Sequence, residues 1–245
     1  MVNGIINVYK EKGYTSFDVV AKLRGIFKQK KIGHTGTLDP DAEGVLPVCL
    51  GKATKVCDLL TDKSKEYEAV LLLGKVTDTQ DITGTVLEEK DVKVTEEAVR
   101  ETVLSFVGDY MQIPPMYSAL KVNGKKLCDL AREGKTVERQ ARPVKILTID
   151  ILDVTLPRVR MRVHCSKGTY IRTLLEDIAA AMGQKGTMSA LRRTTAGVYT
   201  EADAHTLEEI QAAKDAGPEA LQALMLPVES VFESLPLLVA EPGGE

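Results

Sequence analysis

Residues 31–55 hold the side chains whose types and spacing could do chemistry. The polar groups of this stretch are crowded into one loop: His34, Thr35, Thr37 and Asp39. Glycines let its backbone take tight turns or positive φ angles: Gly33, Gly36, Gly44 and Gly51. Pro40 fixes its own φ and biases Asp39 toward an extended conformation, which exposes the carboxylate. Such a carboxylate could act as a nucleophile or as a base.

The same residues also have an ordinary structural interpretation. Asp-Pro is a common turn dipeptide, and Asp39-Pro40 taken alone favours a simple turn. The loop carries more hydrogen-bonding groups than a connection needs, which favours a functional loop. Other parts of the chain must decide between these interpretations.

The segments before and after this loop show the periodicity of regular elements. Residues 4–9 predict a short strand, and Thr15 or Ser16 caps a predicted helix. The apolar face of that helix is Phe17, Val20, Leu23 and Phe27. Residues 65–73 predict a strand that enters the core, and residues 78–84 a turn. A second helix is predicted from the cap at Thr95 to residue 107, with an inward face of Val99, Val103, Leu104, Phe106 and Val107.

The second half of the chain predicts strands followed by a helix. Residues 144–156 predict a strand, and residues 158–165 alternate between apolar and polar side chains, which is typical of a half-buried strand. The next helix ends at Gly183, and Tyr170 and Arg172 lie in its first turn. Polar groups at a strand-to-helix junction suit a cleft, although a tyrosine at a helix start is often simply half-buried. Antiparallel-type strands with a few covering helices favour an α+β protein.

Residues 110–142 differ from the rest because they are basic and poor in core residues. They contain Pro114-Pro115, a turn at Asn123-Gly124 and one short amphipathic helix near 125–133. A long basic insertion of this kind fits a mobile flap that closes on a ligand. A solvated excursion without function is the alternative.

Charge is distributed unevenly along the 245 residues. Residues 201–245 carry ten acidic residues and one lysine, whereas residues 1–200 have a net charge of +6. A basic body predicts a polyanionic ligand such as nucleic acid. Basic residues form two clusters, one over residues 121–145 and one made of Arg158, Arg160, Arg162, Lys167 and Arg172. A solvated charged face explains either cluster, taken alone, equally well.

Several classes of protein are excluded by what the sequence lacks. There is no apolar run long enough to span a membrane and no signal stretch, so we expect a cytoplasmic protein. The four cysteines form no CxxC pair and the three histidines are scattered, so we expect no metal site. Gly51-Lys52 is not a P-loop, because Ala53 follows the lysine and Leu46 stands where the first glycine is required.

Six segments together resemble the bacterial tRNA pseudouridine-55 synthases, the TruB family. They are 33–55, similar to the catalytic motif, 9–16 and 65–84, similar to the first and second motifs, 114–127, similar to the mobile thumb, and 165–174 and 191–193, similar to the later motifs. The resemblance implies the pseudouridine-synthase fold, with a mixed, mainly antiparallel sheet, covering helices, a central cleft and an inserted thumb. It implies a catalytic domain over 1–220 with the thumb at 110–142. Residues 221–245 would begin a C-terminal region whose usual RNA-binding module is absent or truncated.

The resemblance also implies a reaction and roles for individual residues. The enzyme would isomerise uridine to pseudouridine at position 55 in the T-loop of tRNA, by base flipping and an aspartate-dependent break and re-formation of the glycosidic bond. Asp39 matches the catalytic aspartate, Arg172 the arginine that pairs with it, and Tyr170 a candidate general base. Tyr67 matches the tyrosine that stacks on the target base, His34 the histidine that holds the flipped bases, and Leu191 an apolar contact to uracil. No metal, no coenzyme and no obligatory partner protein are implied, and a monomer is expected.

One departure and two alternatives belong beside this resemblance. Cys128 stands where the thumb of the family commonly has an aromatic residue. A guide-RNA-dependent synthase of the related archaeal and eukaryotic branch is disfavoured by the short chain and the bacterial-type thumb. A non-catalytic RNA-binding protein on the same scaffold is disfavoured because the Asp39 loop is intact.

Overall fold

Nine strands form the main sheet of the computed structural model, which describes residues 2–232. Seven lie side by side in the order β1 (Gly4–Lys10), β3 (Glu43–Leu50), β12 (Gly186–Ala196), β4 (Lys65–Leu73), β11 (Arg158–Cys165), β10 (Arg142–Thr155) and β7 (Gly108–Gln112). Two join from the side, β2 (Ile32–His34) on β3 and β13 (Tyr199–Thr200) on β12. Among the described residues, β12 pairs with β3 in parallel and the other neighbours in this sheet are antiparallel. The prediction of an α+β fold with a mixed, mainly antiparallel sheet is therefore confirmed.

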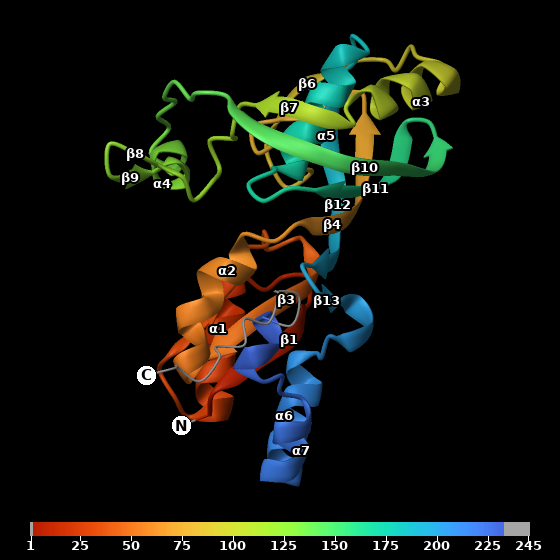
Figure 1. The fold of residues 1–245 in the computed structure, drawn as a ribbon. Helices are drawn as coiled ribbons and strands as arrows, with labels where there is room; N and C mark the ends of the chain where they lie inside the picture. The colour runs from red at the N-terminus through yellow and green to blue at the C-terminus, as the bar shows by residue number, and fades with distance from the viewer. Residues whose placement is uncertain (1, 233–245) are drawn as a thin grey trace, which may run out of the picture.

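Helices cover the sheet in two groups, one toward each end of β4 and β12, the strands that run from one half of the molecule to the other (Figure 1). The half with β1 and β3 carries α1 (Ser16–Phe27), α2 (Cys57–Thr61), α6 (Leu207–Ala216) and α7 (Pro218–Ala223). The half with β7, β10 and β11 carries α3 (Glu96–Ser105) and α5 (Ile171–Ala181). Three short 3-10 helices, η1 (Gly51–Val56), η2 (Glu201–Asp203) and η3 (Val228–Phe232), lie with the first group.

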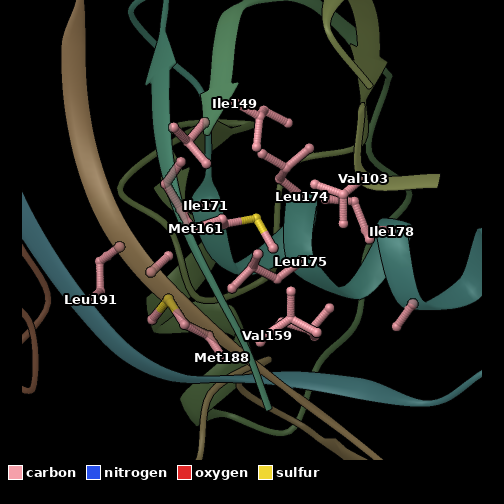
Figure 2. Close-up of a cluster of buried hydrophobic side chains, with 14 of the residues drawn as sticks. Val103, Ile149, Val159, Met161, Ile171, Leu174, Leu175, Ile178, Met188 and Leu191 are labelled. Atoms are coloured by element: carbon pink, nitrogen blue, oxygen red, sulfur yellow. The ribbon is translucent and has the colours of Figure 1, made fainter. Parts of the chain in front are cut away.

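Helix α5 lies against the sheet and contributes much of the larger core, which Figure 2 shows. Its buried face contains Ile171, Leu174, Leu175 and Ile178, at the three- and four-residue spacing of an amphipathic helix. These side chains meet Met161 of β11 and Met188 of β12. Each fully buried aliphatic side chain contributes roughly 1.5–3 kcal/mol, so this core fixes where α5 begins relative to the sheet. Tyr170 and Arg172 are held at that start.

Two predicted apolar faces are only partly right. The capping box at Thr15 begins α1 as expected, but Phe17 is 63% exposed and its ring lies under Arg24. The buried stripe of α1 passes through Val19, Val20 and Leu23, which leaves position 17 on the flank of the helix. In α3 the buried residues are Val99 and Val103, whereas Leu104 and Val107 are exposed. The helix ends at Ser105, so Val107 follows the helix instead of facing the core.

The insertion between β7 and β10 contains the short strands β8 (Lys121–Val122) and β9 (Lys125–Lys126) and the helix α4 (Leu127–Arg132). The turn between the two strands has positive φ at both Asn123 and Gly124, as the Asn-Gly pair predicts. These elements project beside the main sheet (Figure 1). A second small sheet pairs β5 (Lys75–Thr77) with β6 (Val86–Glu89), and the loop between these strands contains residues 78–84.

The C-terminal part of the described chain returns to the first strand. Ile5 and Leu226 exchange two backbone hydrogen bonds of 2.8 Å, and Leu221 and Met225 pack on the core around β1. Residues 233–245 of the C-terminal region expected at 221–245 lie outside the described residues. Over residues 2–232, none of the helices is long and apolar enough to cross a membrane.

Candidate active site

The loop that carries Asp39, residues 35–42 between β2 and β3, is tied to the N-terminal segment of the chain. The Ser16 hydroxyl bonds both backbone groups of Leu38, accepting from its N–H at 2.8 Å and donating to its carbonyl at 3.2 Å. The Pro40 carbonyl accepts from the Gly13 backbone N–H at 2.8 Å and from Lys10 Nζ at 3.2 Å. The backbone on both sides of Asp39 is therefore fixed, while the Asp39 side chain stays 37% exposed.

Arg172 holds the Asp39 carboxylate from the start of α5. Its Nε lies 3.0 Å from Asp39 Oδ2, and one terminal nitrogen donates to Oδ1 at 3.4 Å. The terminal nitrogens of Arg172 also donate to the carbonyls of Thr79 at 2.8 Å and Tyr117 at 2.9 Å. The nitrogen that bonds Thr79 lies 3.8 Å from Asp81 Oδ2. The side chain of Arg172 is only 7% exposed. One buried guanidinium thus joins the Asp39 loop, the loop 78–84 and the insertion.

The electrostatics of Asp39 result from opposing influences. Burial raises the pKa of Asp39 above the ordinary aspartate value, Arg172 lowers it, and the nearby carboxylate of Asp81 raises it again. The net direction is upward. The guanidinium of Arg172 therefore opposes the effect of burial and favours the ionised form of Asp39.

Tyr170 precedes α5 and is positioned by a buried amide. Gln112 accepts from the Tyr170 backbone N–H at 2.8 Å and donates to its carbonyl at 3.0 Å, so β7 holds this residue by both backbone groups. Burial raises the pKa of the Tyr170 phenol above its usual value. The phenol is consequently protonated at neutral pH.

Tyr67 and Leu191 lie on the neighbouring central strands β4 and β12. Leu191 is 9% exposed and packs on the larger core (Figure 2). Burial raises the pKa of the Tyr67 phenol, while the guanidinium of Arg193 beside it lowers the pKa through its charge and a hydrogen bond. The Tyr67 phenol is therefore neutral, with the guanidinium of Arg193 on one side of it.

A cavity of about 870 Å³ connects most of the predicted site residues. Its lining includes Asp39, Tyr67, Tyr170, Arg172 and Leu191, together with six further cationic side chains: Lys12, Lys65, Arg132, Arg142, Lys167 and Arg193. The volume is within the usual range for pockets that hold small molecules. Residues of three sheet strands, β4, β10 and β12, and of the insertion meet at this one place.

His34 is not among the residues that line the cavity. It lies at the end of β2, opposite Val48 of β3, and its Nδ1 accepts from the Gly36 backbone N–H at 3.4 Å. Burial and the charge of Arg193 lower the pKa of His34, so the imidazole is neutral at pH 7 and its Nε2 carries the proton. The structure places His34 beside the base of the Asp39 loop instead of facing Asp39.

Two buried cations at this loop were missed by the sequence interpretation. Lys10 is fully buried, and burial lowers its pKa to about 8. Arg193 is 2% exposed and donates to the carbonyls of Val45 at 2.7 Å and Gly36 at 3.2 Å. Both occur in segments that resemble family motifs, 9–16 and 191–193, and this was the available signal. The alternation of side chains along a strand predicts on which face of the sheet a residue lies. It does not predict that the residue has a partner on a distant loop.

Gly44 shows how closely β12 approaches the loop. Its φ is +106°, and a Cβ at this position would lie 2.2 Å from the Arg193 carbonyl oxygen. We expect Gly44→Ala to lower the free energy of unfolding by about 3 kcal/mol, measured by urea titration, because backbone strain and overpacking add. Gly13 is the matched control, because its φ is +92° and an added methyl group would meet no atom within 4 Å, so Gly13→Ala should cost only about 1 kcal/mol. Equal losses for the two variants would contradict this account.

Comparison with known proteins decides the family. Residues 24–171 match the model of the TruB family pseudouridylate synthase N-terminal domain, and residues 172–233 match that of the tRNA pseudouridylate synthase B C-terminal domain. The chain belongs to the TruB family. Family membership shows that it is an enzyme of the pseudouridine synthase type, an isomerase.

Relatives of this TruB chain are similar over most of their length. It is 57% identical to the tRNA pseudouridine synthase B of Lachnoclostridium phytofermentans, covering 98% of this chain and 80% of the relative. It is 48% identical to the enzyme of the same name from Alkaliphilus oremlandii, covering 93% of this chain and 75% of the relative.

A solved structure described as a Cbf5-Nop10-Gar1 complex aligns with a TM-score of 0.76 at 33% identity, covering 94% of this TruB chain. The alignment covers 61% of that solved chain, so the present chain spans about three-fifths of its length. A structure of an H/ACA RNP bound to a substrate RNA aligns with a TM-score of 0.72 at 30% identity, over 94% of this chain and 61% of that one. These neighbours confirm the predicted pseudouridine-synthase fold.

Proposed function

We propose that this TruB protein isomerises uridine to pseudouridine at position 55 in the T-loop of tRNA. The observation that carries the proposal is the ion pair of Asp39 with the buried Arg172 in the wall of a cavity that Tyr67, Tyr170 and Leu191 also line. Relatives named tRNA pseudouridine synthase B support tRNA as the substrate. In this proposal residues 1–220 form the catalytic domain and residues 110–142 form its thumb.

The reaction sets requirements that Asp39 can meet. The N1–C1′ bond of uridine breaks, the base turns, and C5 bonds to C1′. C5 gives up its proton and N1 takes one up, so the product is an isomer and no external reactant is needed. Asp39 must be ionised whether it adds to the sugar or the base or removes a sugar proton. Arg172 favours that form, because its charge lowers the pKa that burial raises. Both carboxylate oxygens of Asp39 face donors of Arg172, which fixes the plane of the carboxylate.

The target base must leave its stack to reach Asp39. Flipping a nucleotide costs a few kcal/mol, and stacking on an aromatic ring returns roughly 1–3 kcal/mol. Tyr67 supplies that ring, and Leu191 supplies an apolar contact on the neighbouring strand. His34 would contact the flipped neighbours of the target base outside the cavity.

Tyr170 is proposed to lie beneath the reacting nucleotide. Its raised pKa means that the phenol carries its proton in the resting enzyme. A role as general base for the C5 proton therefore requires the phenol to give up its own proton in the same step. Gln112 keeps the residue in place by holding its backbone.

The cationic rim of the cavity fits a phosphate backbone. We expect tRNA affinity to fall on the order of 10²-fold between about 50 and 200 mM salt, because each neutralised phosphate releases counterions. Arg132→Gln should reduce the slope of log affinity against log salt by about one, measured by filter binding. Arg100→Gln is the control, since Arg100 lies on α3, pairs with Glu96 and is not part of the cavity lining. Equal slopes for the Arg132 variant and the wild type would remove α4 from the proposed interface.

Incubation with a T-arm stem-loop transcript, followed by chemical mapping of pseudouridine at single-nucleotide resolution, tests the function. We expect modification at the T-loop uridine by the purified protein alone, without guide RNA or partner protein, and a monomer by size-exclusion chromatography with light scattering. Modification that appears only after a guide RNA is added would favour the guide-dependent alternative. Tight binding without conversion would favour a non-catalytic RNA-binding protein.

A further inference from the structure

Arg193, like Lys10, is a buried cation at the Asp39 loop to which the proposed reaction and RNA binding assign no role. We infer that Arg193 is a positioning residue for the pseudouridine reaction, which fixes both ends of the Asp39 loop and the phenol of Tyr67 relative to each other. This inference rests on the proposed function and deepens it. Arg193 lines the cavity, and we assign its effect to these groups because its guanidinium nitrogens donate to the carbonyls of Val45 and Gly36.

The hydrogen bonds of Arg193 join the two ends of the loop. Its Nε donates to the Val45 carbonyl at 2.7 Å, after the loop, and one terminal nitrogen donates to the Gly36 carbonyl at 3.2 Å, near its start. Asp39 lies between these two anchors. Lys10 holds the Pro40 carbonyl in the middle of the same loop. The path of the backbone that carries Asp39 is therefore defined at three points by buried cations.

Two glycines lie close to Arg193, Gly36 in the loop and Gly44 at the start of β3. The would-be Cβ of Gly44 collides with the Arg193 backbone at 2.2 Å. At Gly36, whose φ is +154°, a Cβ would lie 3.5 Å from a terminal nitrogen of Arg193, the nearest atom to it. Gly44 thus lets the backbone approach Arg193 closely, whereas the contact at Gly36 is an ordinary van der Waals distance. Arg193 also borders a register shift between β12 and β4, and bulges of this kind re-aim a side chain near active sites.

Arg193 connects the loop to the stacking ring. It lies directly opposite Tyr67 in the antiparallel register of β12 and β4, so the two side chains share one face of the sheet, and its charge lowers the pKa of the Tyr67 phenol. Within residues 2–232 its charge faces carbonyl oxygens and this phenol and pairs with no carboxylate, unlike neighbouring Arg192, which pairs with Glu68 and Glu201. Burying a guanidinium without a carboxylate costs free energy. A residue that served stability alone would not need a buried guanidinium without a carboxylate partner. A residue that sets the distance between the Asp39 loop and the Tyr67 ring does need a charged group at this place.

Arg193→Met and Arg193→Lys test the inference in single-turnover assays with the T-arm stem-loop. We expect Arg193→Met to lower the conversion rate about 10²-fold with the RNA affinity unchanged, since small misplacements of reacting groups have effects of this size. Arg193→Lys keeps the charge but cannot reach both loop ends, so its rate should be intermediate. Arg192→Met is the matched control, on the same strand with its side chain on the solvent side, and should convert at the wild-type rate.

A double-mutant cycle with Tyr67→Phe separates positioning from simple stabilisation. If Arg193 acts through the phenol, the effects of Arg193→Lys and Tyr67→Phe on the rate are not additive. All rates are measured below the thermal midpoint of each variant and normalised to RNA-binding stoichiometry, so unfolded protein does not count. Wild-type rates for both Arg193 variants, additive effects in the cycle, or a loss confined to RNA affinity would each overturn the inference. An inactive wild-type protein would instead overturn the proposed function, which keeps the two failures distinct.

Discussion

Asp39→Asn is expected to lower pseudouridine formation by about 10⁴-fold or more while tRNA still binds with near wild-type affinity. Asparagine has the shape of aspartate but no charge, so it can act neither as the nucleophile nor as the base that the reaction needs. Losses of this size are typical when a group that acts directly in the chemistry is removed. Binding should persist because Tyr67 and the cationic rim of the cavity are unchanged.

The measurement is single-turnover conversion of the T-arm stem-loop beside filter binding of the same RNA. Asp91→Asn makes the same chemical change at an exposed loop position outside the cavity lining and should convert normally. If Asp39→Asn converted uridine at a rate near that of the wild type, Asp39 could not be the reacting carboxylate.

Arg172→Met should have the second-largest effect, a fall in rate on the order of 10²- to 10³-fold, because a preorganised partner of the reacting charge is lost. It should also move the acidic limb of the pH–rate profile to higher pH. Burial raises the pKa of Asp39 and Arg172 opposes the rise, so removing Arg172 raises the pKa further and leaves less ionised Asp39 at a given pH. The thermal midpoint should fall as well, since the carbonyls of Thr79 and Tyr117 lose their donor.

Asp81→Asn is the matched variant, in which the acidic limb of the pH–rate profile is expected to move in the opposite direction. The Asp81 carboxylate raises the pKa of Asp39, so neutralising it should move the acidic limb to lower pH. The amide oxygen of asparagine can still accept from Thr83 as Oδ1 does at 2.6 Å, which keeps the loop 78–84 in place. Limbs that moved in the same direction in both variants would mean that the profile does not report the ionisation of Asp39.

The sequence was sufficient for elements whose pattern is local. The helix cap at Thr15, the period-two strand 158–165 and the Asn-Gly turn of the insertion all form as predicted, because each depends on neighbours in the chain. The residues at the edges of apolar helix faces were predicted less well. Phe17 and Leu104 were expected to face the core and are exposed, because exposure at the flank of a helix depends on which elements pack against it.

The site needed more than pattern. Asp39 was noticed from composition, but its partners came only from the family resemblance, since residues 39 and 172 are brought together by tertiary folding. The carbonyl partners of Arg172 and Arg193 belong to backbone that carries no side-chain signal. The sequence also does not say which side chains of one segment face the cavity. His34 is close to Asp39 in sequence, yet the structure places it outside the cavity lining.

The position of β12 between β3 and β4 has a consequence for the synthesis of the protein. β4 ends at Leu73 and β12 ends at Ala196, so the ribosome adds about 120 residues before the gap in the sheet can close. At roughly 5–20 residues per second, two unpaired strand edges stay open for about 6 to 25 seconds. Such edges are templates for association with other chains. The last central strand to be made, β12, also carries Leu191 and Arg193. The sheet therefore closes and the catalytic cavity is completed in the same folding step.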